Sequence, residues 1–420
     1  MKIKTKWVSY EYTQQLPPPP KEKLGRPSFL FRLLIRILSA FELRKTKFTY
    51  TKIRMNEAGK GPYLILMNHS SFIDLKIASK LFFPKSYYIV CTTDGFVGKK
   101  WLMRRIGCIP TRKFITDVTL TRNMIRAVNK KKRSVLLFPE AGYSLDGLTT
   151  VIPKSLASLI KKMNVPVVSV ITDGAFLRQP LYNNLHLRKT KVSAQMKCLL
   201  TKAEIAEKST DEIFAALNEE FAFDNFRNQV NNSVKIEEEN RADGLNRILY
   251  RCPACQTEGK MRGEGIRLVC EHCQKSYIMD EYGQMHAENS ETEFTHIPDW
   301  TAWERECVRK ELENGSYRME LDVDIGIIAD YKAMYMVGDG KLVHTNNGFE
   351  LVGCDGKLNY TQSPLSSYCL NSDFYWYEIG DVIGIGDNKR LYYCFPKQKD
   401  VVMKARFATE ELYKMLKNND

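Results

Sequence analysis

The chain has 420 residues, enough for two or three domains, and its fractions of hydrophobic (44%) and charged (27%) residues are those of a globular protein, which excludes a disordered or fibrous chain. Its net charge of +14 is unevenly distributed: residues 1–134 contain 29 Lys and Arg against 7 Asp and Glu, whereas residues 135–420 contain 34 against 42. The cationic first third favours an anionic partner (nucleic acid, an acidic lipid surface or a phosphorylated substrate), unless its lysines only keep the surface solvated.

Neither a signal peptide nor a conventional membrane span is expected. The N-terminus has no apolar core after its basic residues, and no run of about 18 uninterrupted apolar residues exists. Of the 11 cysteines, four form two Cys-x2-Cys pairs and the other seven are scattered singly. This usage suits a reducing cytosol better than a disulfide framework.

Residues 1–60 form a basic N-terminal segment with one predicted amphipathic helix. The stretch RPSFLFRLLIRILSAFEL (26–43) is mostly apolar, and Pro27 suits its first turn. Polar residues recur on one narrow face, namely Ser28, Arg32, Arg36 or Ser39, and Glu42. Two internal arginines make this helix too polar to span a membrane, and the sequence leaves open whether it lies in a membrane surface or packs on its own domain.

Residues 61–227 alternate between strand-like and helical patterns. The apolar runs PYLILM, YYIVCTT, SVLLFPE and VPVVSVIT are separated by helical patterns such as 117–131 and 153–163, and a last helix begins near Thr210, the expected N-cap. This alternation predicts a layered α/β domain. The polar, charged stretch that follows, 228–249, is expected to be a linker.

Three further regions follow the linker. Residues 250–280 hold the paired cysteines, and 281–316 are expected to connect onward through a helix over 299–315 that ends at Gly315. From 317 to 420, alternating strands and turns predict a small β-rich domain, barrel-like or pleckstrin-like. Its expected hairpin turns are GDGK (338–341) and CDGK (354–357), and a short helix over 407–416 is expected to close it.

The stretch ILMNHSSFID places His69, one of six histidines, at the exit of an apolar strand, with Asp74 five residues later. An offset of five turns about 140° on a regular helix, so the two meet only if His69 lies in the strand-to-helix turn and Asp74 in the first helical turn. A carboxylate on Nδ1 then holds the tautomer in which Nε2 accepts a proton. With no activated Ser or Cys in the pair, it indicates a general base acting on a substrate hydroxyl, unless His69 only caps a helix.

Four sequence blocks occur in a fixed order over about half of the chain. They are NHSSFID (68–74), GCIPTR (107–112), FPEAGYS (138–144) and VPVVSV (165–170). The first is similar to NHxxxxD and the third to FPEGTRS of the glycerolipid acyltransferases, the family of 1-acyl-glycerol-3-phosphate acyltransferase, and the other two resemble its second and fourth blocks. One block alone is weak, but the ordered set resembles this family specifically.

The resemblance implies an enzyme that moves an acyl group from acyl-CoA or acyl-carrier protein to a hydroxyl, usually of a lysophospholipid. His69 would be the general base that deprotonates the acceptor, and Asp74 would orient it. The second and third blocks would hold the acceptor's phosphate or glycerol through Gly107, Arg112, Phe138, Pro139 and Glu140. Glu140 could instead support the base.

The third block departs from the family pattern directly after Glu140. Tyr143 stands where an arginine is usual, so one phosphate contact is missing, worth about 1.5–3 kcal/mol if charge-assisted. The acceptor therefore stays open. A second hypothesis also remains: a catalytically weak lipid- or partner-binding scaffold that keeps the acyltransferase fold.

Two Cys-x2-Cys knuckles lie within 251–277 and consist of Cys252, Cys255, Cys270 and Cys273. This spacing predicts a tetrahedral zinc ribbon with four thiolate ligands and no open position for chemistry, with redox-active Cys-x2-Cys pairs or an iron site as the alternatives. The ribbon would either order a module too small for its own core or bind a partner or nucleic acid.

The expected partners are a lysophospholipid acceptor, acyl-CoA or acyl-carrier protein, and an anionic membrane surface. Nucleic acid is not expected, because the charge is present but no base-reading module is visible. We expect a cytoplasmic enzyme, peripheral on the inner face of the membrane, with structural zinc and no redox cofactor.

Overall fold

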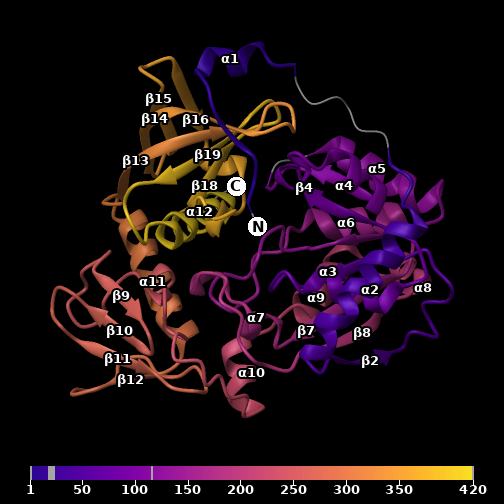
Figure 1. Ribbon diagram of the computed structural model, residues 1–420, viewed down its shortest axis with the longest axis horizontal. Helices are drawn as coiled ribbons and strands as arrows, with labels where there is room; N and C mark the ends of the chain where they lie inside the picture. Colours follow the sequence, from indigo (N-terminus) through magenta and orange to yellow (C-terminus); the bar gives the residue numbers. More distant parts are fainter. Residues whose placement is uncertain (1, 18–23, 115–116, 419–420) are drawn as a thin grey trace. The chain divides into compact units, whose positions relative to one another are not determined.

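The computed structural model describes residues 2–17, 24–114 and 117–418. The chain forms two compact units (Figure 1), each described here by itself. The α/β unit comprises Pro20–Gln179 and Lys189–Asn225, and the β-rich unit comprises Met1–Pro19, Pro180–Arg188 and Phe226–Asp420. This division differs from the predicted linear order of domains, since the β-rich unit takes up the start of the chain and a segment from within the predicted α/β domain.

A seven-stranded sheet with the order β2-β8-β7-β3-β6-β4-β5 forms the centre of the α/β unit. All neighbouring strands are parallel except β7 and β8, which are antiparallel. The four strand-like runs of the sequence become β3, β4, β6 and β7. The strands are β2 (Thr49–Ile53), β3 (Leu64–Met67), β4 (Tyr87–Thr92), β5 (Cys108–Thr111), β6 (Ser134–Leu137), β7 (Val167–Asp173) and β8 (Ser193–Leu200).

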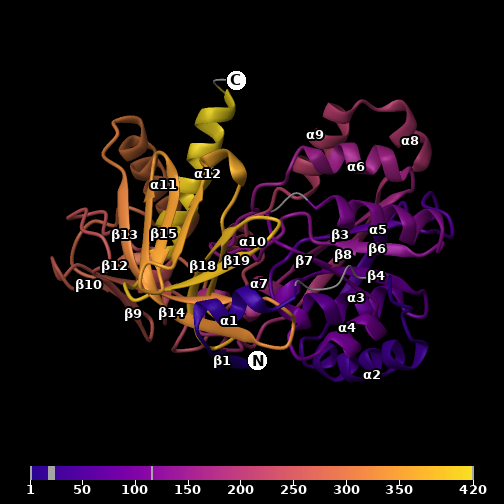
Figure 2. The ribbon, with the colours of Figure 1, turned by 90° about the horizontal axis from the view of Figure 1, so that it is seen from above.

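Helices cover both faces of this sheet, as Figure 2 shows, so the prediction of a layered α/β domain is confirmed. In β3, Leu64 and Leu66 face a core shared with α5, α6 and α9, while Ile65 and Met67 face a core shared with α2 and α3. The helices are α2 (Phe29–Lys45), α3 (Asp74–Phe82), η1 (Thr93–Phe96), α4 (Lys100–Ile106), α5 (Val118–Asn129), α6 (Ser155–Met163), α7 (Ala175–Arg178), α8 (Lys202–Glu207) and α9 (Thr210–Glu220). The next helix, α10 (Asn225–Asn231), belongs to the β-rich unit except for its first residue.

The cap of α9 differs from the prediction by one residue. Ser209 is the N-cap, and Thr210 is the first helical residue. Ser209 Oγ accepts the N–H of Glu212 at 3.2 Å, and the Glu212 carboxylate accepts the N–H of Ser209 at 2.7 Å. This capping box satisfies two donors at once, which a cap at Thr210 would not.

Helix α2 packs on the α/β unit with its polar face. Glu42 forms ion pairs with Lys76 of α3 and with Arg178, Ser39 is buried, and Arg32 donates to the carbonyl oxygen of Pro84 at 2.8 Å. Its apolar face is exposed: Phe29, Leu30, Leu34, Ile37, Leu38 and Phe41 are 48–71% exposed. No helix among the described residues is long and apolar enough to cross a membrane.

The β-rich unit contains a four-stranded sheet (β12-β11-β10-β9) and a larger antiparallel sheet of the order β16-β15-β14-β13-β19-β18-β17, to which β1 adds in parallel beside β14. Its strands are β1 (Thr5–Trp7), β9 (Met261–Glu264), β10 (Arg267–Cys270), β11 (Ser276–Met279), β12 (Met285–Ala287), β13 (Arg318–Ile327), β14 (Met334–Thr345), β15 (Gly348–Gly353), β16 (Leu358–Gln362), β17 (Asn371–Trp376), β18 (Gly380–Gly386) and β19 (Leu391–Pro396). Its helices are α1 (Tyr10–Gln15), η2 (Leu181–Asn183), η3 (Leu245–Arg247), α11 (Ile297–Glu313), η4 (Pro364–Ser366) and α12 (Val402–Asn418).

A β-rich C-terminal region is confirmed, but two local predictions differ. GDGK (338–341) lies inside β14, directly after Val337, which a bulge of β14 leaves without a partner in β13, and the turn is made by Asn346 and Asn347 instead. CDGK (354–357) does form the turn between β15 and β16. The predicted helix 407–416 is the central part of the longer α12.

The predicted linker 228–249 is packed against the β-rich unit, to which it belongs. Ile236, Leu245, Ile248 and Leu249 are at most 1% exposed, and Arg241 donates to the carbonyl oxygen of Met279 at 2.8 Å. These few apolar side chains hold the polar stretch against the protein, because each of them is completely removed from water.

Candidate functional site

The candidate active site lies at one edge of the α/β sheet. Strands β3, β6, β4 and β5 are parallel, so their carboxyl ends meet along that edge, where open α/β sheets bind ligands. His69 follows the end of β3 by two residues, and Asp74 is the first residue of α3. The strand-to-helix placement predicted for this pair is therefore observed.

His69 and Asp74 are in direct contact. Nδ1 of His69 lies 3.0 Å from Oδ2 of Asp74, and the same oxygen accepts the backbone N–H groups of Ser70 (2.8 Å) and Ser71 (3.0 Å). Asp74 is fully buried, whereas the His69 side chain is 17% exposed. Three bonds to one oxygen hold the carboxylate in place, and the carboxylate in turn orients the imidazole so that Nε2 is the nitrogen that can accept a proton.

Two buried side chains hold the backbone around His69. Oδ1 of Asn68 accepts the N–H and the hydroxyl of Thr172, at the end of the neighbouring β7, at 2.8 and 3.1 Å. Glu140 accepts the N–H of His69 through Oε1 at 3.4 Å and the N–H of Thr150 through Oε2 at 3.1 Å. The turn that carries His69 is thus tied to both neighbouring strands.

Aromatic rings enclose the imidazole. The centroid of Phe138 lies 3.9 Å from that of His69, with an angle of 21° between the planes, and that of Tyr143 lies 3.7 Å away at 29°. Two rings cannot share one face at these distances, so they cover opposite faces. Phe72, 42% exposed, contacts the edge of Tyr143 with centroids 5.7 Å apart.

Burial lowers the pKa of His69 below its usual value; the hydrogen bond and charge of Asp74 oppose this shift, and the positive charge of Lys113 adds to it. The imidazole is therefore neutral at pH 7. A neutral ring with Nδ1–H bound to Asp74 carries its lone pair on Nε2, which is the protonation state that a general base requires.

The remaining predicted residues separate into two groups. Phe138, Pro139 and Glu140 follow β6, and Arg112 follows β5, so all four lie at the carboxyl edge with His69. Gly107 precedes β5 and lies at the opposite end of that strand. Its φ of +97° and the 2.7 Å that would separate an added Cβ from Pro27 Cγ explain why a glycine is needed there.

Sequence reasoning did not assign roles to Asn68, Lys113, Thr150 or Tyr143 at this site. Asn68 lies next to His69, and Tyr143 was noted only as a replaced arginine. For Thr150, which binds Glu140 from ten residues away, the sequence carries no local signal. Its contact arises only when the loop after β6 folds back.

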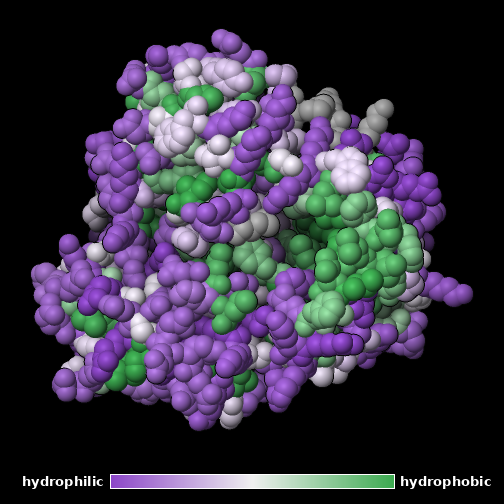
Figure 3. Space-filling view, viewed as in Figure 1, coloured by the Kyte–Doolittle hydropathy of each residue, from purple (hydrophilic) through white to green (hydrophobic). Residues whose placement is uncertain are grey.

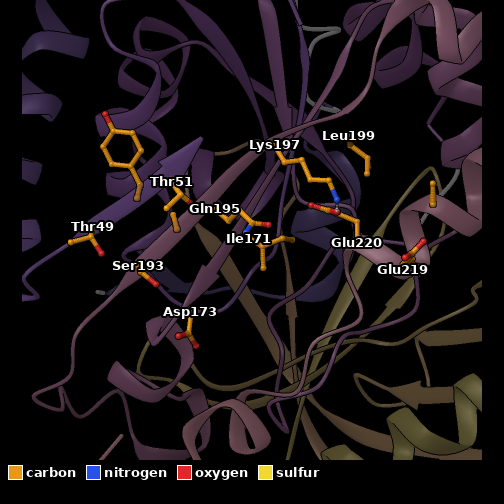
Figure 4. A pocket seen from close by; sticks show the side chains of 13 residues that line it. Thr49, Thr51, Ile171, Asp173, Ser193, Gln195, Lys197, Leu199, Glu219 and Glu220 are labelled. Atoms are coloured by element: carbon orange, nitrogen blue, oxygen red, sulfur yellow. Dashed lines mark hydrogen bonds and ion pairs between the residues drawn. The ribbon is translucent and has the colours of Figure 1, made fainter. Parts of the chain in front are cut away.

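A hollow of about 580 Å³ opens elsewhere on the α/β unit, beside β2, β7, β8 and α9 (Figure 4). Asp173, Gln195 and Glu219 line it, together with Lys197, whose ammonium lies 2.5 Å from Glu220. None of the predicted site residues lines this hollow, so it is separate from the His69 site.

The four cysteines of the two knuckles are brought together in the β-rich unit. Their sulfur atoms all lie within 4.8 Å of one another, and the Cys252–Cys273 and Cys255–Cys270 pairs are 3.7 Å apart. A tetrahedral zinc ion with bonds of about 2.3 Å requires sulfur separations of about 3.8 Å. The set therefore fits such a metal ion.

The two knuckles have the same backbone shape. Gln256 (φ 60°) and Gln274 (φ 62°) follow them in the left-handed conformation, and each donates its N–H to the carbonyl oxygen of the first cysteine of its knuckle at 2.8 Å. Backbone N–H groups also point at the sulfur atoms of Cys252 and Cys270. Such donors stabilise thiolate charge in metal sites.

Comparison with known proteins gives three findings. A search of curated proteins finds no significant match. Among solved structures, the 1-acyl-sn-glycerophosphate (LPA) acyltransferase PlsC from Thermotoga maritima is similar at 18% identity with a TM-score of 0.36, and the match covers 46% of this chain and 76% of that one. The model of the Acyltransferase family matches residues 40–173, the segment that contains β3, β6 and the His69–Asp74 pair. Residues 40–173, about a third of the chain, are thus similar to the Acyltransferase family.

Proposed function

We propose that the protein transfers a fatty acyl group from the thioester of acyl-CoA or acyl-carrier protein to a hydroxyl of a lysophospholipid such as 1-acyl-glycerol-3-phosphate. The observation that carries this proposal is the His69–Asp74 pair, held at 3.0 Å within the Acyltransferase-family segment. The pair has the geometry and the neutral imidazole of a general base.

The proposed reaction is an acyl transfer with general-base catalysis. Nε2 of His69 takes the proton of the acceptor hydroxyl as the oxygen attacks the thioester carbonyl. The new C–O bond gives a tetrahedral intermediate, whose collapse breaks the C–S bond, and the His69 imidazolium returns the proton to the leaving thiolate. Asp74 stabilises the imidazolium, and base catalysis of this kind contributes about 10²–10⁴ in rate.

The acceptor would bind at the same edge. Arg112 follows β5 there, and Lys113 is near enough for its charge to lower the pKa of His69. A guanidinium and an ammonium suit a phosphate group. Glu140 is fully buried and accepts the N–H groups of His69 and Thr150, so its contacts favour support of the base over contact with glycerol hydroxyls.

Access to lipid substrates would come from the exposed apolar face of α2, the green area that Figure 3 shows around α2 and α3. Six side chains of α2 that are about half exposed or more would gain about 1 kcal/mol each on entering a bilayer surface. Arg44 and Lys45, exposed in the last turn, would add about 1 kcal/mol each with anionic lipid. We therefore place the enzyme on a membrane surface, the cytoplasmic inner face in the expected arrangement.

The cysteine cluster would hold a structural zinc ion. Cys252, Cys255, Cys270 and Cys273 supply four thiolates, which fill a tetrahedral site and leave no position for substrate. The ion would order the small sheet β9–β12 and take no part in acyl transfer.

The decisive test is His69→Ala, with purified protein, acyl-CoA or acyl-carrier protein, a panel of lysolipids, and thiol release as readout. We expect acyl transfer to fall by at least about 10² in the variant. His286→Ala is the matched control, because Nε2 of His286 also lies 3.0 Å from an aspartate, Asp280, but in an exposed pair of the β-rich unit. Activity retained in His69→Ala rules out the base, and no thiol release by the wild type with any acceptor supports the alternative, a lipid-binding scaffold.

A further inference from the structure

The loop that follows β6 contacts His69 four times. Phe138 and Tyr143 cover the two faces of its ring, with centroids 3.9 and 3.7 Å away. At the backbone, Glu140 accepts the N–H of His69 at 3.4 Å, and Ser144 donates its N–H to the carbonyl oxygen of His69 at 2.9 Å. The loop thus holds both the ring and the main chain of this residue.

The position of Tyr143 is fixed by its neighbours. Ala141 has a left-handed backbone (φ 53°), which turns the chain after β6, and Ser144 is held on both sides, since its N–H binds His69 and its hydroxyl donates to the carbonyl oxygen of Leu148 at 2.7 Å. Tyr143, directly before Ser144, lies with its ring over the imidazole. The Phe72 ring further contacts that of Tyr143.

We propose that Tyr143 is a positioning residue for the base: its ring closes the second face of the His69 imidazole, so that only the Nε2 edge is open to the acceptor hydroxyl. The Nδ1 edge is already occupied by Asp74. With both faces and one edge covered, the ring cannot tilt, and the hydroxyl approaches in the plane of the ring, where the Nε2 lone pair lies. This inference rests on the acyl transfer proposed above.

The charged groups that face His69 come from three elements. Asp74 lies at the start of α3, Glu140 follows β6, and Lys113 follows β5. Substitution of Tyr143 leaves all three in place and reduces the burial of the His69 ring. Burial is the largest cause of the lowered pKa of His69. Loss of the Tyr143 ring therefore moves this pKa upward, toward that of a solvated histidine.

The experiment combines NMR with kinetics on the full chain. Histidine is labelled with ¹⁵N, the signal of His69 is identified by its loss in His69→Gln, and its titration and tautomer are followed in the wild type, Tyr143→Ala, Tyr143→Phe and Phe72→Ala. Phe72→Ala is the matched control, since this ring contacts Tyr143 but is itself 42% exposed. The other histidines report on the fold.

In Tyr143→Ala we expect the titration of His69 and the acid limb of kcat/KM to move together to higher pH. We also expect kcat to fall about 10- to 100-fold through lost alignment, with KM for the acceptor within about twofold. Tyr143→Phe should restore the wild-type values, because the ring is kept. An unchanged His69 titration and tautomer in Tyr143→Ala overturn the inference, whereas a shifted titration in a protein that transfers no acyl group overturns only the proposed function.

Discussion

Replacement of Asp74 by asparagine tests how the base is held. Oδ2 of Asp74 accepts three hydrogen bonds at 2.8–3.0 Å, and an amide oxygen can accept the same three. The amide nitrogen then takes the place of Oδ1, which is buried and has no hydrogen-bond partner among the described residues. A buried donor left unsatisfied costs about 1–3 kcal/mol.

The catalytic effect of Asp74→Asn should be larger than its effect on stability. An uncharged amide no longer stabilises the imidazolium of His69 and permits the wrong tautomer, so we expect kcat to fall about 10²- to 10⁴-fold. A loss of about 1–3 kcal/mol leaves a domain of ordinary stability folded. Thiol release at pH 7 and urea unfolding measure the two effects separately.

Asp280→Asn is the control for this variant. Asp280 also pairs with a histidine, but its side chain is 30% exposed, and an asparagine oxygen can still accept the N–H groups of Tyr282 and Gln284. We expect no change in turnover. If Asp74→Asn kept more than a tenth of the wild-type activity, or failed to fold, the proposed role of the Asp74 carboxylate in stabilising the His69 imidazolium would be refuted.

Three further predictions concern other parts of the chain. Burial lowers the pKa of His344 from 6.5 to about 3, so protonation favours the unfolded chain. The free energy of unfolding of the β-rich unit should therefore fall by roughly 3–5 kcal/mol as the pH drops from 6.5 to 3. In urea titrations His344→Gln should reduce this dependence of stability on pH, and an unchanged dependence would contradict the role of His344. Cys252→Ser should lower the bound zinc from one ion per chain and weaken the hydrogen-exchange protection of β9–β12. Cys307→Ser, outside the cluster, should keep the metal, and equal zinc contents of the two variants in metal analysis would exclude the proposed site. Leu38→Gln, at a position 61% exposed on α2, should weaken cosedimentation with anionic vesicles about five- to tenfold. Ile379→Gln, at an exposed position of the β-rich unit, should not weaken it, and equal binding of both variants would refute membrane binding through α2.

Local patterns in the sequence were sufficient for the parallel sheet and for the central pair of the site. Strands such as β3 are short apolar runs because both faces are buried, and that signal is contained in four consecutive residues. The offset between His69 and Asp74 likewise required only a strand end followed by a helix start. The knuckle spacing of Cys252 and Cys270 carried the same kind of local information.

Contacts between segments far apart in the chain could not be predicted from local sequence patterns. Strand β1 is three residues long and exposed, and nothing in its sequence indicates that it pairs with β14 more than 300 residues later. The stacking of Tyr143 on His69 depends on the path of a loop, and Gly107 was assigned to the substrate because its block was treated as one site. The strand β5 separates the two ends of that block.

The path of the chain between the two units has a practical consequence for dissecting the protein. The β-rich unit is assembled from three separate stretches, and the middle one is anchored by Arg188, 2% exposed, whose guanidinium donates to the carbonyl oxygen of Arg241 at 2.8 Å. A fragment that starts at residue 226 lacks both this anchor and β1, and a fragment that ends at residue 225 carries Leu181 and Tyr182 without the core that buries them. Neither half can be cut out as one continuous piece, so a protein trimmed to either half should expose apolar surface and aggregate.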